Sequence, residues 1–231
     1  VVYDALKKLI TLDKGWIQKV DGATLYIRPT MVASEAGLGV RPAKQYIFFI
    51  INCPVGAYYP EGFNPVKIFV TDKYVRAVAG GVGNVKTGGN YAASIMAAVE
   101  AQKQGYTQVL WLDAIERRYI EEVGTMNIFF LIGDELITPP LTGSILPGIT
   151  RDSVLRLTKD WGLKVSEKRI SIGDVLSANE HVGDGALVGH LLEGVLDVSS
   201  SLNLIKLDDS GFDILGFQEL LGLIGKRAVR F

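Results

Sequence analysis

Hydrophobic and polar positions alternate with strand-like spacing at several places in the first third of the chain. Residues 23–29 alternate and are rich in β-branched side chains, and residues 66–71 repeat the pattern. Residues 46–51 form a continuous apolar run, which is typical of a buried strand. Residues 1–10 instead place their apolar side chains on one helical face, and residues 54–62 are dense in glycine and proline. The pattern therefore predicts a helix, three strands and one connector.

Farther along the chain, the pattern predicts two amphipathic helices. They are expected at residues 91–104 and 150–161, and a glycine, Gly105 or Gly162, follows each and can end it. A polar N-cap should begin the second helix. The side chains that we expect on the buried faces are Ile95, Met96 and Val99 in the first helix, and Val154, Leu155 and Leu157 in the second.

Strands are predicted between these helices and near the end of the chain. Residues 109–113 form one strand. Residues 127–132 and 135–138 form a hairpin, because the Gly-Asp pair at 133–134 supplies the positive φ angles of a tight turn. The last expected elements are a strand at residues 203–207, a turn at 208–211 and a helix at 212–223.

Composition and charge exclude several classes of protein. With 231 residues, of which 48% are hydrophobic and 21% charged, the chain fits one large globular domain or slightly more. Its 24 basic and 25 acidic residues leave a net charge of −1, so neither a nucleic acid nor an anionic membrane is expected as a main partner. Every apolar run is far shorter than the ~18 residues of a membrane span.

The few cysteines and histidines narrow the chemistry further. Cys53 is the single cysteine, so the chain forms no internal disulfide, which fits a reducing compartment. The two histidines, His181 and His190, are too few for a histidine-rich metal site, and we expect no metal. No cleavable signal pattern begins the chain, so we expect a cytoplasmic or mitochondrial protein rather than a secreted one.

Residues 79–91 form the most unusual segment, with five glycines between positions 80 and 89. Lys86 and the threonine after it resemble the end of a phosphate-binding P-loop, but Val85 stands where that loop needs its second glycine. The dinucleotide pattern G-x-G-x-x-G also fails, because Lys86 replaces its third glycine. Two interpretations remain: the glycines clear space around a lysine that binds a flat cofactor, or Lys86 is a surface lysine in a mobile loop.

The segment Gly80–Tyr91, G-G-V-G-N-V-K-T-G-G-N-Y, closely resembles the lysine segment of branched-chain amino acid aminotransferases, which are fold-type IV pyridoxal-phosphate enzymes. Five further blocks resemble this family in the same order. They are L-Y-I-R-P (25–29), C-P-V-G-A-Y (53–58), Q-V-L-W-L (108–112), E-E-V-G-T-M-N-I-F (121–129) and G-S-I-L-P-G-I-T-R (143–151). A collinear resemblance of this extent, over roughly residues 1–178, is highly specific.

The resemblance implies a mixed α/β fold of fold type IV, with a small α/β domain followed by a large pseudo-barrel domain. We expect residues 1–58 to be the remaining part of the small domain and residues 59–71 to be an interdomain connector. Residues 72–231 would then form the large cofactor-binding domain, with residues 178–231 divergent.

Two features of the family have no match. An F-E-G-x-K-A-Y-R-like motif of the small domain is missing, so we expect the chain to begin inside that domain. The G-T-G-T-A-like loop has its nearest counterpart at residues 180–187, where Asp184 replaces a hydroxyl residue. Because a carboxylate repels a phosphate and the arginine of the missing motif is absent, we expect weak cofactor binding. Because the missing part of the small domain would leave apolar surface of residues 25–27 and 46–51 uncovered, we expect a chain that is marginally stable or self-associates.

By resemblance, the cofactor is pyridoxal 5'-phosphate, and Lys86 is the lysine that binds it covalently. Tyr91 would bond its phenolic oxygen, and Thr125 would lie near it. Glu122 would bond the pyridine nitrogen and keep it protonated. Without the resemblance, Glu122 is interpreted as a solvated carboxylate in a charged stretch, and Asn127 as a strand residue with a structural hydrogen bond.

The start of the second helix is an independent candidate for the phosphate site. Free backbone N–H groups and the positive end of the helix dipole favour an anion there. Gly148 permits a close approach, and Ile149 and Thr150 would donate backbone N–H groups. The alternative is an ordinary capped helix, and the family resemblance favours the phosphate site.

Three residues resemble the substrate pocket of the family. Tyr26 and Tyr58 would form an aromatic wall for a branched aliphatic side chain, and Arg28 would pair with the side-chain carboxylate of glutamate or 2-oxoglutarate. The alternative for Tyr26 and Arg28 is an ordinary strand face. Pocket residues act across a dimer interface in this family, so we expect a homodimer.

The resemblance implies reversible transamination of leucine, isoleucine and valine with 2-oxoglutarate, which gives branched-chain 2-oxo acids and glutamate. The expected partners are therefore small amino acids and 2-oxo acids, besides a second copy of the chain. One alternative is a truncated or decayed homologue without catalysis. Another is a different fold-type IV enzyme, either a D-amino acid aminotransferase or a lyase.

Overall fold

The computed structural model describes residues 1–17, 19, 23–56, 67–132 and 134–175, together with the backbone of three later strands. These strands are β9 (Leu187–Leu191), β10 (Leu202–Asp208) and β11 (Gly211–Gly216). The chain forms two compact units, Val1–Gly62 and Phe63–Phe231. Within the described ranges, every helix is too short or too polar to cross a lipid bilayer.

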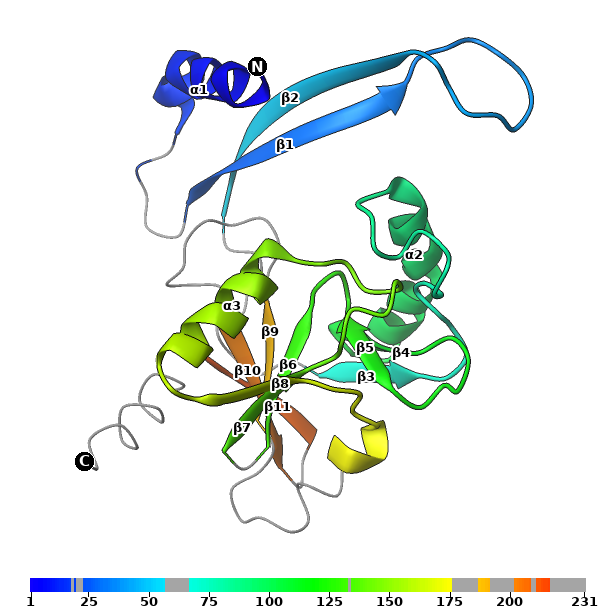
Figure 1. Cartoon of the computed structure of the whole chain (residues 1–231), viewed down its shortest axis with the longest axis vertical. Helices are drawn as coiled ribbons and strands as arrows, with labels where there is room; N and C mark the ends of the chain where they lie inside the picture. Colours follow the sequence, from blue (N-terminus) through cyan, green and yellow to red (C-terminus); the bar gives the residue numbers. More distant parts are fainter. Residues whose placement is uncertain are drawn as a thin grey trace. The chain divides into compact units, whose positions relative to one another are not determined.

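The first unit consists of a helix and a two-stranded sheet (Figure 1). Helix α1 spans Val2–Asp13, and a short 3₁₀ helix, η1, covers Lys14–Trp16. Strands β1 (Thr24–Ala33) and β2 (Tyr46–Val55) pair antiparallel along their whole length. The helix and both strands predicted for this part of the chain are confirmed, and each strand extends four residues past its predicted end.

The apolar run in β2 is a strand, but its predicted burial is wrong. Five of its large side chains are between 38% and 54% exposed: Tyr46, Ile47, Phe48, Phe49 and Ile51. A continuous apolar run is buried only where both faces of its strand are covered. The described residues of this unit make a two-stranded ribbon, and α1 beside it buries none of its own residues. The pattern therefore predicted the strand conformation of this run correctly and the burial of its side chains incorrectly.

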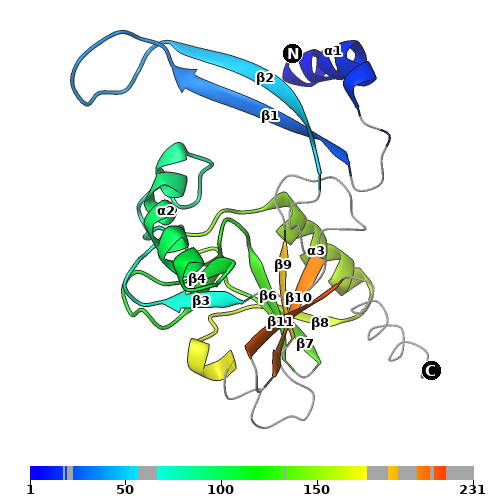
Figure 2. The ribbon, with the colours of Figure 1, turned by 180° about the vertical axis from the view of Figure 1, so that it is seen from behind.

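The second unit begins with a three-stranded sheet in the order β3-β4-β5 (Figure 1), and Figure 2 shows β3 and β4 from behind. Strand β3 (Ile68–Thr71) runs parallel to β4 (Gln108–Leu112), and β5 (Ile120–Val123) pairs antiparallel with β4. Helix α2 (Gly88–Lys103) makes the crossover that a parallel pair requires. Strand β3 lies within residues 59–71, the expected connector, and its pairing with β4 places it in the second unit.

Helix α2 begins three residues before its predicted start, and its buried face differs from the predicted one. Ile95, Met96 and Val99 are 60%, 63% and 40% exposed. The face that contacts the sheet carries Ala97 and Ala101, which pack against apolar residues of β4. Small side chains four positions apart let the helix approach the sheet closely. The larger apolar residues consequently lie away from the sheet.

A six-stranded mixed sheet completes the second unit, in the order β11-β10-β9-β6-β7-β8. Strands β6 (Ile128–Ile132) and β7 (Glu135–Thr138) form the predicted hairpin, although Gly133 of its turn lies outside the described residues. Helix α3 (Ile149–Asp160) connects β7 to its parallel neighbour β8 (Lys164–Glu167). Strand β10 confirms the predicted strand near the C-terminus.

Two predictions for helices in this unit are wrong in part. The segment predicted as a helix at residues 212–223 begins as strand β11, and its remainder lies outside the described residues. Helix α3 has Gly148 at its N-cap instead of a polar side chain. Of its three predicted core residues, Leu157 is 41% exposed and the other two are half-buried. Instead, Arg151 and Thr158 are buried.

Asp113 fixes the turn between β4 and β5 through four backbone hydrogen bonds. Its Oδ1 accepts the N–H groups of Arg118 and Tyr119, and its Oδ2 accepts those of Ile115 and Glu116, at 2.7–3.2 Å. Burial alone would raise the pKa of this carboxyl, but the four donors outweigh it and the pKa lies below its ordinary value of 3.8.

We expect Asp113→Ala to lower the free energy of unfolding by about 2–3 kcal/mol at neutral pH, because the N–H donors of the turn lose a charged acceptor. Since the folded-state pKa is depressed, this stabilisation is present above pH 3.8 and is lost as the pH falls through the folded value. Urea unfolding between pH 2 and 7 measures the difference. The exposed Asp72→Ala is the control, and equal stability of both variants at pH 7 would contradict the assignment.

Candidate functional site

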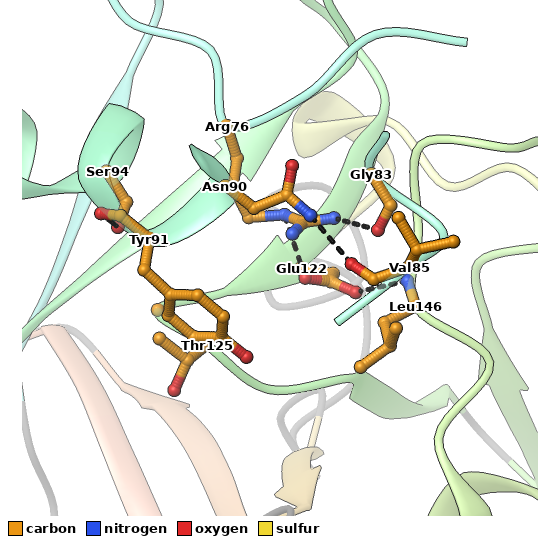
Figure 3. A pocket seen from close by; sticks show the side chains of 10 residues that line it. Arg76, Gly83, Val85, Asn90, Tyr91, Ser94, Glu122, Thr125 and Leu146 are labelled. Carbon is orange, nitrogen blue, oxygen red and sulfur yellow. Dashed lines mark hydrogen bonds and ion pairs between the residues drawn. The ribbon is translucent and has the colours of Figure 1, made fainter. Parts of the chain in front are cut away.

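A small pocket lies between the start of α2, the end of β5 and the loop that leads to α3 (Figure 3). Within the described part of the chain, the volume of this pocket is about 10 Å³, which is enough for about one water molecule. Its walls carry both charged and aromatic side chains. The lining residues are Arg76, Gly83, Val85, Asn90, Tyr91, Ser94, Glu122, Gly124, Thr125 and Leu146.

Glu122 is the buried acid of this pocket. Its residue is 2% exposed, and its Oε2 lies 2.8 Å from Nε of Arg76. Its Oε1 accepts the backbone N–H of Leu146 at 3.0 Å (Figure 3). The same oxygen accepts the side-chain amide of Asn127 at 3.3 Å. The alternative of a solvated carboxylate is therefore wrong. Asn127 makes the structural hydrogen bonds expected of it, including one to the Leu146 carbonyl at 2.9 Å.

Strand β5 places a second buried acid, Glu121, next to Glu122 in sequence. Successive side chains of a strand point to opposite faces, so the two carboxyl groups face different surroundings. Glu121 is 8% exposed, and its Oε1 accepts the hydroxyl of Ser144. Burial raises the pKa of the Glu121 carboxyl, and the hydroxyl and the charge of Arg76 oppose only part of that effect.

Arg76 is the central residue of the site, and it was not predicted from the sequence. Its side chain is 8% exposed, and its Nη2 donates to the carbonyl oxygens of Ser144 and Gly83, the latter at 3.4 Å. One guanidinium therefore connects Glu122, the glycine-rich loop and the loop before α3. The available signal was a lone arginine among apolar residues, in the run Y-V-R-A-V just before the glycines.

We expect Arg76→Met to lower the free energy of unfolding by about 3–5 kcal/mol, because Glu122 would remain buried without its cation. Denaturant unfolding measures this change. The matched control is Arg156→Met, which breaks an exposed pair with Asp152 and should leave stability nearly unchanged. Adding Glu122→Gln to Arg76→Met should recover part of the loss, and no recovery would show that the pair does not explain it.

The glycine-rich loop is held in place by packing and by Asn90. A Cβ atom at Gly83 would collide with the carbonyl oxygen of Ser144, so only glycine permits this approach of two loops. Asn90, in the first turn of α2, donates to the carbonyl oxygens of Val82 and Val85 at 2.8 and 2.9 Å. Asn90 was not singled out from the sequence. The loop that carries Lys86 is thus tied to the pocket at both ends.

Lys86 is exposed, and its Nζ lies 5.4 Å from the centre of the Tyr91 ring. Tyr91, 37% exposed, lines the pocket together with Thr125 and Glu122. The structure therefore brings three of the predicted cofactor residues into one pocket and places the predicted lysine beside one of them.

The predicted phosphate residues lie at the start of α3. Gly148 is its N-cap, and Ile149 and Thr150 are its first two residues. Gly148 has no side chain, so the N-cap residue itself makes no capping hydrogen bond to the first N–H groups of α3. Leu146, two residues before the N-cap, lines the pocket, whereas the three predicted residues do not.

The predicted substrate residues of the first unit are paired with each other. Tyr26 and Arg28 share one face of β1, the guanidinium donates to the Tyr26 hydroxyl at 2.8 Å, and it lies 5.0 Å from the ring centre. Tyr58 lies outside the described residues, as do Asp184 and the segment around it.

The family model for class IV amino-transferases matches residues 5–199 of the chain, which is most of its length. The chain belongs to this family. The class IV aminotransferase resembles branched-chain-amino-acid aminotransferase 2 of Bacillus subtilis strain 168, with 54% identity over 213 residues. That alignment covers 92% of this chain and 58% of the relative, so the chain spans little more than half the length of the curated relatives that it matches.

Solved structures of the same family share the fold. The branched-chain amino acid aminotransferase of Escherichia coli superposes with a TM-score of 0.66 at 27% identity, over 87% of this chain and 64% of that one. The T.th. branched-chain amino acid aminotransferase, complexed with N-(5'-phosphopyridoxyl)-L-glutamate, gives a TM-score of 0.58 at 27% identity. This second superposition covers 72% of the present chain and 51% of the T.th. enzyme. The expected mixed α/β fold of fold type IV is confirmed.

Proposed function

We propose that this class IV aminotransferase catalyses the reversible, pyridoxal-phosphate-dependent transamination of leucine, isoleucine and valine with 2-oxoglutarate. The names of the relatives support branched-chain transamination, and the ligand in the T.th. enzyme joins a phosphopyridoxyl group to glutamate. The single observation that carries the proposal is the buried Glu122–Arg76 pair, which faces a pocket lined by Tyr91 and Thr125.

The donors and acceptors of this pocket suit the cofactor. An ionised carboxylate that is held by a buried guanidinium is the partner that a protonated pyridine nitrogen requires. When bound, the cofactor supplies an electron sink for the charge that develops on the substrate Cα. Tyr91 offers a hydroxyl in the first turn of α2, and Lys86 stands beside it.

Lys86 has two proposed tasks. Its Nζ would hold the cofactor between turnovers, and the freed amine would then accept the proton from the substrate Cα. The loop around it is suited to both, because glycines surround Lys86 and Asn90 anchors the loop before it. The N–H groups of Ile149 and Thr150, with Gly148 beside them, would bind the phosphate.

The first unit would supply the specificity for both substrates. The ring of Tyr26 offers an apolar wall for a branched side chain, and the guanidinium of Arg28 next to it offers a counter-ion for the second carboxylate of glutamate. Tyr58 would extend this wall. We further propose a homodimer, which the exposed apolar residues of β2 support, and sedimentation of the purified chain tests it.

The decisive experiment incubates the purified chain and pyridoxal phosphate with leucine and 2-oxoglutarate, and measures the glutamate formed. Isoleucine and valine should react, and D-alanine should not. Reaction with D-alanine alone would indicate a D-amino acid aminotransferase, and release of ammonia without glutamate would indicate a lyase. A folded homologue without catalysis, which the small pocket of about 10 Å³ favours, would form no product with any of them.

A further inference from the structure

A second cavity lies in the same unit, and Glu121 of β5 lines it. Its volume is about 210 Å³, far more than the ~10–15 Å³ that a single buried water needs. Glu121 and Glu122 are neighbours on one strand, so their side chains point to opposite faces of β5, and the two cavities share no lining residue. Much of its wall is apolar, including Val78, Pro139 and Ile145.

Glu121 brings an incompletely paired carboxyl into this cavity. The residue is 8% exposed and accepts one hydrogen bond, from Ser144 to Oε1. Among the described residues, this is the one hydrogen bond that its carboxyl makes, and the nearby charge of Arg76 acts on it as well. A buried carboxyl with so few partners gains strongly from an added cation. Asp113 also lines the cavity, but four backbone N–H groups already satisfy its oxygens.

A guanidinium borders the same cavity. Arg169 lies with its guanidinium carbon 3.5 Å from the centre of the Tyr119 ring, and it donates to Glu116 at 2.8 Å. These two contacts hold an otherwise half-exposed side chain in one orientation. Burial raises the pKa of the Glu121 carboxyl, and the Ser144 hydroxyl, the charge of Arg76 and, more weakly, the charge of Arg169 lower it. The cavity thus combines an acid, a base and an apolar wall.

We propose that this cavity binds a free α-amino acid with an apolar side chain. The ammonium group would pair with Glu121, the carboxylate would face Arg169, and the side chain would contact Val78, Pro139 and Ile145. An amine without a carboxylate would bring a second positive charge near Arg169 without pairing with it, and a carboxylic acid without an amine would bring a second negative charge near Glu121. Only the zwitterion satisfies both charges. This proposal does not depend on the transaminase activity.

Titration of L-valine into the ¹⁵N-labelled full chain tests the proposal. The Lys86→Ala background is used so that no reaction in the other pocket interferes. Amide signals of Ala79, Ile115 and Ile145 should shift with saturable binding, whereas that of Gly124, which lines the other pocket, should not. Isobutylamine lacks the carboxylate of valine, and isovalerate lacks its ammonium group. Each should bind at least about tenfold more weakly than valine.

Two variants complete the test. Glu121→Gln keeps an acceptor for Ser144 and should weaken valine binding about tenfold or more, because the ammonium group loses its anion. Arg169→Met should weaken binding by a similar factor, because the carboxylate loses its cation. Amide spectra that match the parent establish that each variant is folded. If the cavity amides do not shift, or if both variants bind valine as the parent does, the cavity is not an amino acid site. Neither result would bear on transamination, which the glutamate assay measures separately.

Discussion

Replacing Lys86 with alanine is expected to abolish both the visible absorbance of bound pyridoxal phosphate and the formation of glutamate from leucine. In the proposed mechanism, the covalent bond to the cofactor and the proton transfer from Cα both need the Nζ atom, which lies beside Tyr91 of the described pocket. The fold should persist, because Lys86 is exposed and its loop is anchored through Gly83 and Asn90.

The measurements are absorbance of the protein after dialysis against pyridoxal phosphate, glutamate formation and far-UV circular dichroism. Lys103→Ala is the matched control, since it removes an exposed lysine from the last turn of α2. That control should keep the colour and the activity. If the Lys86→Ala variant kept this absorbance at the same wavelength maximum, the cofactor would be bound to another lysine. That result would overturn the role of the glycine-rich loop.

Glu122→Gln is expected to retain cofactor while slowing the conversion of leucine by about a hundredfold or more. The loss is electrostatic: a neutral amide at this position can still bond to the Leu146 N–H, but it cannot keep a pyridine nitrogen protonated. The shape of the pocket should change little, because the substitution is nearly isosteric and Asn127 and Leu146 stay in contact with it.

Single-turnover rates with leucine, compared with cofactor affinity, distinguish this role from a structural one. A purely structural carboxylate would lower stability and affinity together, without a selective effect on the rate. Glu116→Gln is the control, because Glu116 is half-exposed and bonds to Arg169 outside the pocket. Equal turnover in the Glu122→Gln variant and the parent would remove Glu122 from the reaction.

Local sequence determined most of the backbone. Alternation predicted β1 and β3, the Gly-Asp pair predicted the β6–β7 hairpin, and the glycine after each of the helices α2 and α3 marked where it ends. These signals are local, because they depend on which φ and ψ angles a few neighbouring residues can adopt. The helix that was predicted where β11 lies had no comparable signal, and the strand there depends on pairing with β10.

Several residues of the pocket could also be predicted from the sequence. Val85 in place of a glycine excluded a P-loop, and the resemblance to one family pointed to Tyr91, Glu122 and Thr125, which the structure brings into one pocket. The structure added the reason for one of the glycines, since Gly83 touches the loop of Ser144, which lies 61 positions farther along the chain. Such a contact has no signature in the residues that surround Gly83.

Tertiary structure alone decided which side chains are buried and with what. Ile95, Met96 and Val99 formed a plausible apolar face, yet the sheet covers the alanines of α2 instead. Arg76 and Glu122 are 46 positions apart, and only the fold makes them a buried ion pair. Periodicity describes the angles of a backbone, whereas burial and pKa depend on neighbours that arrive from distant parts of the chain. The sequence therefore determined most of the helices and strands and the family, whereas the fold determined which charged side chains meet in the pocket.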